Sequence, residues 1–454
     1  MASGKKKEKL SLEEKLEQAL VPVEEQPYEV PGNWCWTRLG VVSEVVTGST
    51  PSKSKPEYYG NEFPFFKPAD LDAGRYTMIA SEYLSVEGKS VSRIIPAKST
   101  AVCCIGSIGK SGYLEIDGTT NQQINSVIPM INSLYLYYYI NTNMFVNELR
   151  RKASATTISI VNKSKMESNL IPIAPLREQH RIVEKIEKLF AKLDEVKEKA
   201  KTVVDGFELR KSSILHRAFT GKLTERWRTE QGIRMDSWRH CTVGSVCNDI
   251  KVGIVIKPSQ YYTGKNEGTP AFRSANVREC RVDDFDWVYI NEEGMTNNKR
   301  SIVHTGDVLI VRSGNPGTAC VVSDLFDGYN AIDILIAVPN QDLILPDFLC
   351  LFTNSPLGKK SVAEGKRGMA LSHFNVRGYS KVEFNVPLIP EQKEIIRALN
   401  KFLEKEKQAK EAAEVVLDQV DTMKKAILAR AFRGKLGTND PAEQSAVEML
   451  KKIL

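Results

Sequence analysis

The sequence predicts an α+β fold in which two β-rich domains alternate with two long helices that form an antiparallel coiled coil. Three observations lead to this prediction. One segment occurs twice in the chain, both copies have the apolar periodicity of a long helix, and the regions before them are rich in short Val/Ile runs broken by Gly, Pro and Asn. The chain is therefore expected to be a pseudo-two-fold repeat.

Length and composition are typical of a globular protein with two or three domains. The chain has 454 residues, of which 42% are hydrophobic and 26% charged. Its formal net charge of +7 permits nucleic-acid binding without requiring it. No apolar run approaches the roughly 20 residues of a membrane span, and the basic first residues are followed by polar ones rather than by the core of a signal peptide. We therefore expect a cytoplasmic protein with no membrane partner.

The cysteines and histidines do not predict a metal site. The 8 cysteines contain no Cys-x-x-Cys pair, and the 5 histidines are scattered along the chain. In a cytoplasmic protein these cysteines are expected to be reduced thiols, most of them buried.

The repeated segment spans residues 178–223 and 391–436. Both copies begin with Glu-Gln and end with Ala-Phe-x-Gly-Lys-Leu, and they align without a gap. A proline-bounded, strand-like run precedes each copy, and a glycine follows the last helical turn, as is common at helix C-termini. Each copy is expected to form one long helix of about 43 residues and ~60 Å.

Each helix carries a coiled-coil seam, because its apolar residues recur at alternating steps of four and three. The seam of the first helix consists of Ile182, Ile186, Leu189, Leu193, Val196, Val203, Phe207 and Ile214. That of the second consists of Ile395, Leu399, Phe402, Val416, Val420 and Ile427. Arg210 and Glu406 interrupt the seams, and Glu406 must reach solvent or find a cation. The seams predict that the helices pack on each other as a spacer; the alternative is that each packs on its own neighbouring domain.

The regions before the helices repeat more faintly. Trp34 precedes Gly40 in the first region as Trp238 precedes Gly244 in the second. We expect both tryptophans to be core anchors rather than platforms for base stacking. The short apolar runs predict mostly β-structure with a few helices, one of which should open at Pro346.

The order of these features predicts the domain organisation. The expected segments are an N-terminal extension (1–27), a first β-rich domain (28–174), the first long helix (175–222), a linker (223–237), a second β-rich domain (238–388), the second long helix (389–436) and a C-terminal tail (437–454). In the extension, Ser11 and Glu14 have the spacing of a capping box before a short amphipathic helix. Docking to a partner and a loosely attached tail are both open as its role.

The two β-rich domains share a frame but differ in their polar loops, as two similar readers of different ligands would. If the ligand is DNA, the helices would set the distance between two half-sites, at most about 18 base pairs for a ~60 Å rod. Basic side chains would position the phosphates, and Asn or Gln would suit adenine. The candidates are Lys53, Lys55, Lys67, Arg75, Arg93, Lys110, Gln122 and Gln123 in the first domain, and Lys257, Arg273, Asn276, Arg278, Lys299, Arg300, Arg312, Asn315, Lys366 and Arg367 in the second. For any one of them, a solvated charge or a turn amide is an equally open interpretation.

Motifs at the ends of both long helices resemble the specificity subunit of type I restriction–modification systems. They are Pro-Leu-Arg-Glu-Gln at 175–179, Glu-Gln at 391–392 and the doubled Ala-Phe-x-Gly-Lys-Leu ending. The resemblance covers roughly residues 21–437. It implies two target recognition domains that each read one half of a bipartite, asymmetric DNA site, with an antiparallel coiled coil that fixes the gap between the halves.

The resemblance also implies partners. Two modification subunits, which bind S-adenosylmethionine and methylate adenine at N6, and two ATP-dependent restriction subunits would assemble with this chain on double-stranded DNA. S-adenosylmethionine, ATP and Mg would then be bound by those partners. For this chain the resemblance implies no cofactor, no metal and no catalytic residue, so that it catalyses nothing by itself.

Two other functions are open. An enzyme is the first, but the sequence lacks the Asn/Asp-Pro-Pro-aromatic loop of an amino-methyltransferase, and Asp347, Glu364 and Lys366 fit only a loose nuclease pattern. Gly109-Lys110-Ser111 looks like the end of a phosphate-binding loop, but Cys104 stands where its first glycine should be. The second is a structural adaptor whose paired domains bind protein rather than DNA.

Overall fold

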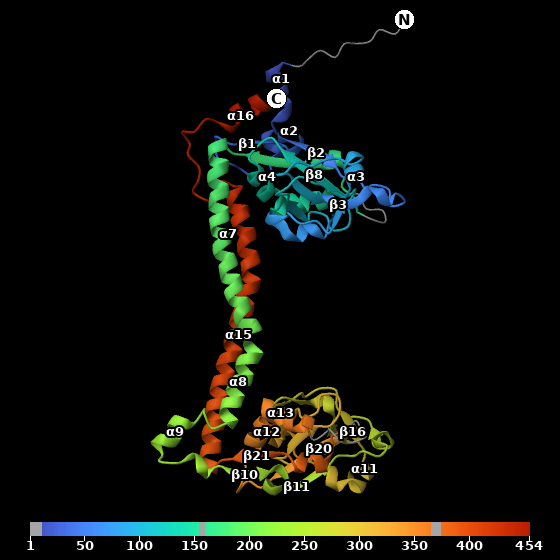
Figure 1. Cartoon of the computed structure of the whole chain (residues 1–454), viewed down its shortest axis with the longest axis vertical. Helices are drawn as coiled ribbons and strands as arrows, with labels where there is room; N and C mark the ends of the chain where they lie inside the picture. Colours follow the sequence, from blue (N-terminus) through green and yellow to red (C-terminus); the bar gives the residue numbers. More distant parts are fainter. Residues whose placement is uncertain (1–10, 154–158, 365–373) are drawn as a thin grey trace. The chain divides into compact units, whose positions relative to one another are not determined.

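A computed structural model describes residues 11–153, 159–364 and 374–454 of the chain. The chain divides into two compact units: unit 1 comprises Met1–Lys199 and Val415–Leu454, and unit 2 comprises Ala200–Glu414. Each unit contains one β-rich domain together with part of each long helix (Figure 1). The two units are described in turn.

The β-rich domain of unit 1 is built on a four-stranded antiparallel sheet in the order β2-β8-β5-β6. Its strands are β2 (Ser43–Thr47), β5 (Thr100–Cys103), β6 (Ser111–Tyr113) and β8 (Ile124–Pro129). A second sheet, in the order β4-β3-β7, consists of β3 (Tyr59–Phe66), β4 (Glu82–Leu84) and β7 (Thr119–Thr120). The two ends of the domain meet in an antiparallel pair, β1 (Cys35–Arg38) and β9 (Leu170–Ile173). The helices are α2 (Leu39–Val42), α3 (Val86–Ser90), α4 (Ser133–Ile140), α5 (Asn143–Lys152) and α6 (Lys163–Glu167).

The domain of unit 2 repeats this plan, with a four-stranded antiparallel sheet in the order β11-β20-β17-β18. Its strands are β11 (Cys247–Val252), β17 (Val308–Val311), β18 (Ala319–Val321) and β20 (Ile334–Pro339). The second sheet, in the order β12-β16-β13-β19, consists of β12 (Tyr262–Thr263), β13 (Thr269–Phe272), β16 (Val288–Ile290) and β19 (Asn330–Ala331). The closing pair is β10 (Arg239–Thr242) with β21 (Glu383–Val386), and a hairpin joins β14 (Val277–Arg278) to β15 (Arg281–Val282). The helices are α10 (Val243–Val246), α11 (Glu292–Asn297), α12 (Pro346–Asn354), α13 (Pro356–Glu364) and α14 (Val376–Ser380).

The helices that back the four-stranded sheets are buried on nearly every side. In α4 the tyrosines are tolerated there because their hydroxyls reach backbone carbonyls of β9: Tyr135 donates to Pro172 at 2.8 Å and Tyr139 to Leu170 at 2.7 Å. In unit 2, α12 opens at Pro346 as predicted, since proline is favoured in the first helical turn.

The phenylalanine of each Ala-Phe-x-Gly-Lys-Leu ending closes the core beside these helices. Phe432 lies edge-on to Tyr135 and Tyr139, each at a centroid distance of 5.0 Å, in unit 1. Phe219 lies edge-on to Phe348 at 5.3 Å in unit 2. Each long helix therefore delivers its last turn to the core of the unit in which the other long helix begins.

The long helices are α7 (Leu176–Asp205), α8 (Phe207–Phe219) and α15 (Ile389–Ala431). The first part of α7 lies along the last part of α15 in unit 1, and α8 lies along the first part of α15 in unit 2, antiparallel in both cases (Figure 1). Ion pairs join the helices: Lys197 to Asp421 at 3.3 Å and Lys424 to Asp194 at 2.5 Å. The predicted α+β fold with a paired, antiparallel coiled coil is thereby confirmed.

The first long helix differs from the prediction, because it is interrupted at Gly206 rather than continuous. The guanidinium of Arg210 bends back to this position and donates to the carbonyl of Val203 at 2.7 Å. A Cβ at Gly206 would overlap Nη1 of Arg210, so glycine is the residue that leaves room for this bond. The same guanidinium donates to Glu406 at 2.6 Å. The two polar residues that interrupt the seams therefore pair with each other, and Glu406 does find a cation.

Most of the predicted seam faces the partner helix, but two positions do not. Ile182, Ile186, Ile395, Leu399 and Val420 are buried, and Leu189, Leu193, Val203, Phe207, Ile214, Val416 and Ile427 are half-buried. Val196 and Phe402 are each 44% exposed, so they are poor seam residues. Because the coiled coil consists of only two helices, a side chain at the edge of their interface is covered by the partner helix on one side and exposed on the other.

Helix α1 (Leu12–Ala19) lies next to the C-terminal helix α16 (Ala446–Ile453) in unit 1. The Ser11 hydroxyl accepts from the N–H of Glu14, whose carboxylate accepts from the N–H of Ser11, and this capping box, predicted from the sequence, opens α1 (Leu12–Ala19). Lys15 donates to the carbonyl of Leu454 at 3.0 Å, next to α16 (Ala446–Ile453). Among residues 11–153, 159–364 and 374–454, no helix is both long enough and apolar enough to cross a bilayer.

Candidate nucleic-acid interface

The glutamate of each Glu-Gln motif ties the start of a β-rich domain to the start of a long helix. In unit 1 the buried carboxylate of Glu178 accepts from the indole of Trp34 at 2.7 Å. It also accepts from the Asn439 amide at 2.8 Å and the Thr438 hydroxyl at 3.2 Å, both from the segment after α15. Three segments that are distant in the sequence are thus joined at one carboxylate, and we refer to this arrangement as the Glu178 clamp.

Unit 2 contains the equivalent Glu391 clamp. The carboxylate accepts from the Trp238 indole at 2.9 Å and from the Thr224 hydroxyl at 2.7 Å. Here a cation is added: the guanidinium of Arg228, on α9 (Glu225–Glu230), lies 2.5 Å from the carboxylate, and both side chains are buried. The predicted anchoring role of the two tryptophans is confirmed, since Trp34 and Trp238 are buried and bonded in matching ways.

The glutamine of each Glu-Gln motif also joins the start of the long helix to the β-rich domain before it. Gln179 donates to the carbonyl of Ala174, and Gln392 to the carbonyl of Pro387, each at 2.9 Å. Each glutamine also accepts a backbone N–H from its β-rich domain. The Glu-Gln motif was noted in the sequence for its repetition, but its part in fixing each domain to the long helices could not be read from spacing alone.

Each β-rich domain extends a loop from the edge strand of its four-stranded sheet. Gly48 follows β2 and Gly253 follows β11. A Cβ at Gly48 would overlap the carbonyl of Asn121, and one at Gly253 that of Ala331, so the chain passes against backbone in both places. We call residues 49–55 and 254–257 the edge loops. Both continue into a short 3-10 helix that begins with proline, Pro56–Tyr58 or Pro258–Tyr261.

The edge loops hold most of the predicted cations that are free to meet a ligand. Lys53 and Lys257 are exposed and, among the described residues, form no ion pair. Lys55 is exposed, and its ammonium donates to the hydroxyl of Tyr58 at 3.2 Å but to no carboxylate of the described residues. Lys299 and Asn315 are exposed elsewhere on unit 2. These side chains can reach phosphate or a base edge without breaking an internal contact.

A second group of predicted cations is engaged with partners at the surface. These contacts are Lys67–Glu82 (2.7 Å), Lys110–Asp72 (2.7 Å), Arg273–Asp286 (2.9 Å), Arg278–Asp283 (2.9 Å), Arg300–Asp249 (3.2 Å), and the bond from Arg93 to the carbonyl of Thr47 (2.6 Å). Ion pairs this exposed contribute little to stability, so phosphate could replace the carboxylate at small cost.

Arg75 and Arg312 are unsuited to reading DNA in this structure. Arg75 binds Glu115 of its own domain and Glu187 of α7, the latter at 3.1 Å. Arg312 lies 2.6 Å from Asp333 and is 13% exposed. Burial opposes ionisation of Arg75, but bonding to the two carboxylates outweighs it and raises the pKa of Arg75 above its ordinary value. In this structure both arginines bind carboxylates of their own unit, and their assignment as DNA contacts stays a prediction.

The predicted adenine readers divide in the same way. Asn276 is fully buried: its amide oxygen accepts from the N–H of Arg273 at 2.9 Å and its amide group donates to the carbonyl of Phe285 at 2.8 Å. In this structure Asn276 is a turn amide, which is the interpretation that the sequence left open beside base reading. Gln122 is exposed and accepts from Thr50 of the edge loop, while Gln123 is half-buried.

Some candidates lie outside the described residues, namely Lys366 and Arg367. Lys366 was also part of the loose nuclease pattern, whose two carboxylates line different cavities: Asp347 the one beside Cys350, and Glu364 the one beside His240. Within the described chain, no group of three or more His, Cys, Asp or Glu side chains could hold a metal ion.

The turn that resembled a phosphate loop lies in unit 1, between β5 and β6. It lines a hollow of about 560 Å³ together with Lys110 and Arg150. Ser111 is followed by strand rather than helix, so the turn lacks the helix N-terminus on which a phosphate loop depends. Lys110 can at most add one cation beside the glycine turn.

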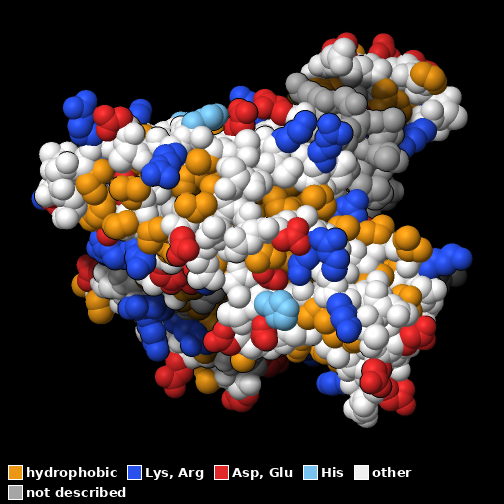
Figure 2. Space-filling view, turned by 90° about the horizontal axis from the view of Figure 1, so that it is seen from below, with side chains coloured by type: hydrophobic (Ala, Val, Ile, Leu, Met, Phe, Trp, Pro, Cys, Tyr) orange, Lys and Arg blue, Asp and Glu red, His pale blue; other side chains and the backbone are white. Residues whose placement is uncertain are grey.

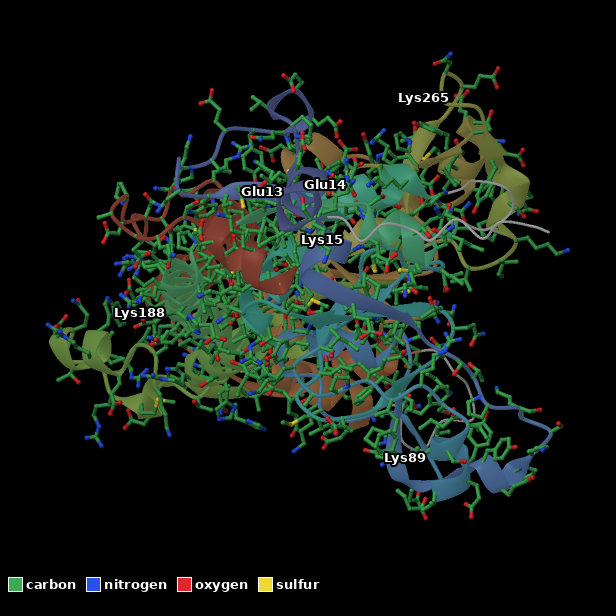
Figure 3. The ribbon with its side chains drawn as sticks, turned by 90° about the horizontal axis from the view of Figure 1, so that it is seen from above. Glu13, Glu14, Lys15, Lys89, Lys188 and Lys265 are labelled. Carbon is green, nitrogen blue, oxygen red and sulfur yellow. The ribbon has the colours of Figure 1, made fainter. Side chains whose placement is uncertain are left out.

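The described cationic side chains do not form one patch on the face that Figure 2 shows. On the face shown in Figure 2, Lys and Arg are interleaved with acidic and hydrophobic side chains. Two of the lysines labelled in Figure 3 lie on the β-rich domains and were not among the predicted contacts: Lys89 on α3 and Lys265 after β12. Lys89 lies 4.3 Å from the ring centroid of Phe63, whereas Lys265 is exposed. No sequence signal distinguished these lysines from other surface cations.

Comparison with known proteins gives one consistent result. Residues 31–204 match the family model described as the type I restriction modification DNA specificity domain. The chain is 22% identical to the type I restriction enzyme EcoKI specificity subunit of Escherichia coli K12, over 94% of this chain and 96% of that protein. It is 23% identical to the EcoBI specificity subunit of Escherichia coli over 70% of each chain.

The fold has a counterpart among solved structures. The HsdS subunit from Thermoanaerobacter tengcongensis superposes with a TM-score of 0.64 and 20% sequence identity, covering 91% of this chain and 100% of that one. The matched domain, the relatives that run the length of the chain and the duplicated clamps agree with one another. The chain is therefore similar to type I restriction enzyme specificity subunits, and its match to their DNA specificity domain lies at residues 31–204.

Proposed function

We propose that this chain supplies the DNA specificity of a type I restriction–modification complex. Each β-rich domain acts as a target recognition domain and reads one half of a bipartite, asymmetric site. The paired helices hold the two domains at a fixed separation, which sets the unspecified gap between the half-sites. The chain itself performs no bond chemistry in this proposal.

The observation that carries the proposal is the pair of edge loops. They leave equivalent edge strands, β2 and β11, of the two four-stranded sheets. Each begins after a glycine where a Cβ would overlap a backbone carbonyl, yet the two loops present different side chains. Unit 1 presents Lys53 and Lys55 among serines, while unit 2 presents Val255, Ile256 and Lys257. Equivalent loops with different chemistry are what two readers of different half-sites require.

The proposed division of labour follows from which side chains are free. The lysines assigned to phosphates are Lys53, Lys55, Lys257 and Lys299, because each is exposed and forms no ion pair with a carboxylate of the described residues. Asn315 and Gln122 remain candidates for base edges. The surface pairs named above would join the interface where DNA displaces their carboxylates.

The proposed partners are modification subunits, which methylate adenine at N6 with S-adenosylmethionine, and restriction subunits that use ATP and Mg. Two of each per specificity chain is the stoichiometry that the family resemblance implies, and it remains a prediction. Because the ligand would be the DNA of the cell, the cytoplasm remains the predicted location.

The test is the salt dependence of DNA binding by the full chain in complex with its modification subunits. The logarithm of the DNA affinity should fall linearly with the logarithm of the salt concentration. Removal of one phosphate contact should make this slope less steep by about 0.9. Lys53→Ala with Lys55→Ala should lower the slope by up to ~2. Lys188→Ala, on the exposed side of α7 (Figure 3), is the matched control and should leave it unchanged. Salt-independent binding, or binding of protein but no DNA, would favour the structural adaptor instead.

A further inference from the structure

The hairpin of β14 and β15 fastens the second β-rich domain to the helices of unit 2. Its turn residue Glu279 receives the ammonium of Lys211 from α8 at 2.5 Å and that of Lys359 from α13. Burial opposes ionisation of Glu279, but these two bonds outweigh it and hold the pKa of Glu279 below its usual range. The turn is therefore held against two helices that border the domain core (Figure 1).

The next residue of the turn, Cys280, lies in contact with a second cysteine. Its Sγ is 3.8 Å from the Sγ of Cys350, on α12, which is far away in the sequence. Asn354, one turn further along α12, donates to Cys280 at 3.3 Å and to Cys350 at 3.5 Å. A disulfide requires the sulfurs to approach by roughly 1.8 Å more, to about 2.05 Å. A thiol is a weak hydrogen-bond donor, so little opposes that approach.

The two thiols differ in access and in acidity. Cys280 is exposed and Cys350 is buried, and both line a cavity of about 350 Å³. The hydrogen bond from Cys350 holds the pKa of Cys280 below its ordinary value, although partial desolvation of the Cys280 sulfur opposes this, and the same bond together with burial raises the pKa of Cys350. Among the described cysteines Cys280 is the exposed one, whereas the others are buried or half-buried.

We propose that Cys280 and Cys350 form a redox-active dithiol whose substrate class is a small-molecule disulfide. The Cys280 thiolate attacks one sulfur of the small disulfide, the S–S bond breaks, and the released thiolate takes up a proton. Cys350 then loses its proton and attacks Sγ of Cys280, which displaces the second small thiol. The protein gives up two electrons and two protons, and the small disulfide is reduced to two thiols.

Closure would tie the hairpin turn covalently to α12. The cross-link encloses a segment of 70 residues that includes both central strands of the four-stranded sheet in unit 2, β17 and β20, so the unfolded chain would lose much of its freedom. A reducing cytoplasm would keep the pair open, and disulfide stress would close it. The inference does not depend on the DNA-reading proposal, because it rests on the thiols alone.

The test uses the full chain with oxidised glutathione as the probe, followed by intact mass and peptide mapping. The wild-type chain should lose two hydrogens at a Cys280–Cys350 cross-link, which dithiothreitol should reverse. Cys350→Ser should stop at a glutathione adduct on Cys280, and Cys280→Ser should leave Cys350 unmodified. Cys320→Ala, which removes a buried neighbour, is the control and should still cross-link.

Thermal unfolding supplies a second measurement. The oxidised wild-type chain should unfold about 5 °C or more above its reduced form, while Cys280→Ser should show no such difference. A stable adduct on Cys280 of the wild-type chain would show that Cys350 does not resolve it and would overturn the proposal. So would modification of Cys280 no faster than that of the half-buried Cys241.

Discussion

The Glu391 clamp offers the sharpest prediction, because a buried charge pair occurs in one unit and not in the other. The substitution Glu391→Gln keeps the size of the side chain and removes its charge. It leaves the guanidinium of Arg228, whose side chain is 8% exposed, without its carboxylate. Loss of one partner of a buried pair typically costs about 3–5 kcal/mol, so unit 2 should be destabilised by that amount.

The matched control is Glu178→Gln in unit 1. Its carboxylate accepts from Trp34, Thr438 and Asn439, all of them neutral donors. The amide loses good hydrogen-bond geometry but strands no cation, so the expected cost is about 1–3 kcal/mol. The two variants therefore separate the cost of an unpaired charge from the cost of an altered hydrogen-bond network.

The assay is urea unfolding of the full chain with pulsed hydrogen exchange read by mass spectrometry. Peptide resolution is needed because two compact units need not unfold together. A double variant, Glu391→Gln with Arg228→Met, should recover at least ~1 kcal/mol relative to Glu391→Gln alone, since it removes both charges. If Glu391→Gln costs no more than Glu178→Gln, or if the double variant recovers nothing, Arg228 is not a buried partner and the reasoning fails.

Three further predictions concern the helices, an edge loop and the hairpin. Arg210→Met or Glu406→Leu alone should each lower the free energy of unfolding by up to ~1 kcal/mol, measured by urea unfolding. The two substitutions together should be neutral or stabilising, because an apolar contact then replaces the half-buried ion pair. Gly48→Ala should cost about 1–3 kcal/mol through overlap with the carbonyl of Asn121, whereas Gly32→Ala, with no atom within 4 Å of its Cβ, should be neutral by the same measurement. The lowered pKa of Glu279 means that its contribution is present above about pH 4.3, its usual pKa, and is lost as pH falls through the folded value. On acidification the free energy of unfolding of unit 2 should therefore fall by under ~1 kcal/mol more in the wild-type chain than in Glu279→Gln. Identical pH profiles for the two chains would contradict the pairing of Glu279.

Much of the fold could be predicted because its signals are local or repeated. Apolar periodicity located the long helices, and the gapless duplication indicated that they pair. The spacing of Ser11 and Glu14 was enough for a capping box, since both partners lie within one turn. The need of Glu406 for a cation was visible, and Arg210 was the other polar interruption of the seam.

The candidate site was predicted less well, because a side chain's partner is usually distant in the sequence. Arg75 looked free until the fold brought Glu187 of α7 to it, and Arg312 looked free until Asp333 did the same. Asn276 is buried by a chain return that no local pattern encodes. Lys53 and Lys257 were predicted only together with many other polar residues, because the residues next to them in the sequence do not show whether a lysine has a carboxylate partner.

The central claim, that two domains read two halves of one DNA site, is tested most directly by mapping N6-methyladenine across the genome that carries this gene. The map would be compared for the intact gene, its deletion, and a form in which the unit 2 edge loop (254–257) is replaced by the unit 1 edge loop (49–55). The account predicts a bipartite motif with a fixed gap that vanishes on deletion, and a loop exchange that alters one half of the motif while the other half and the gap persist. Methylation that is unchanged by deletion, or a loop exchange that alters both halves alike, would contradict it.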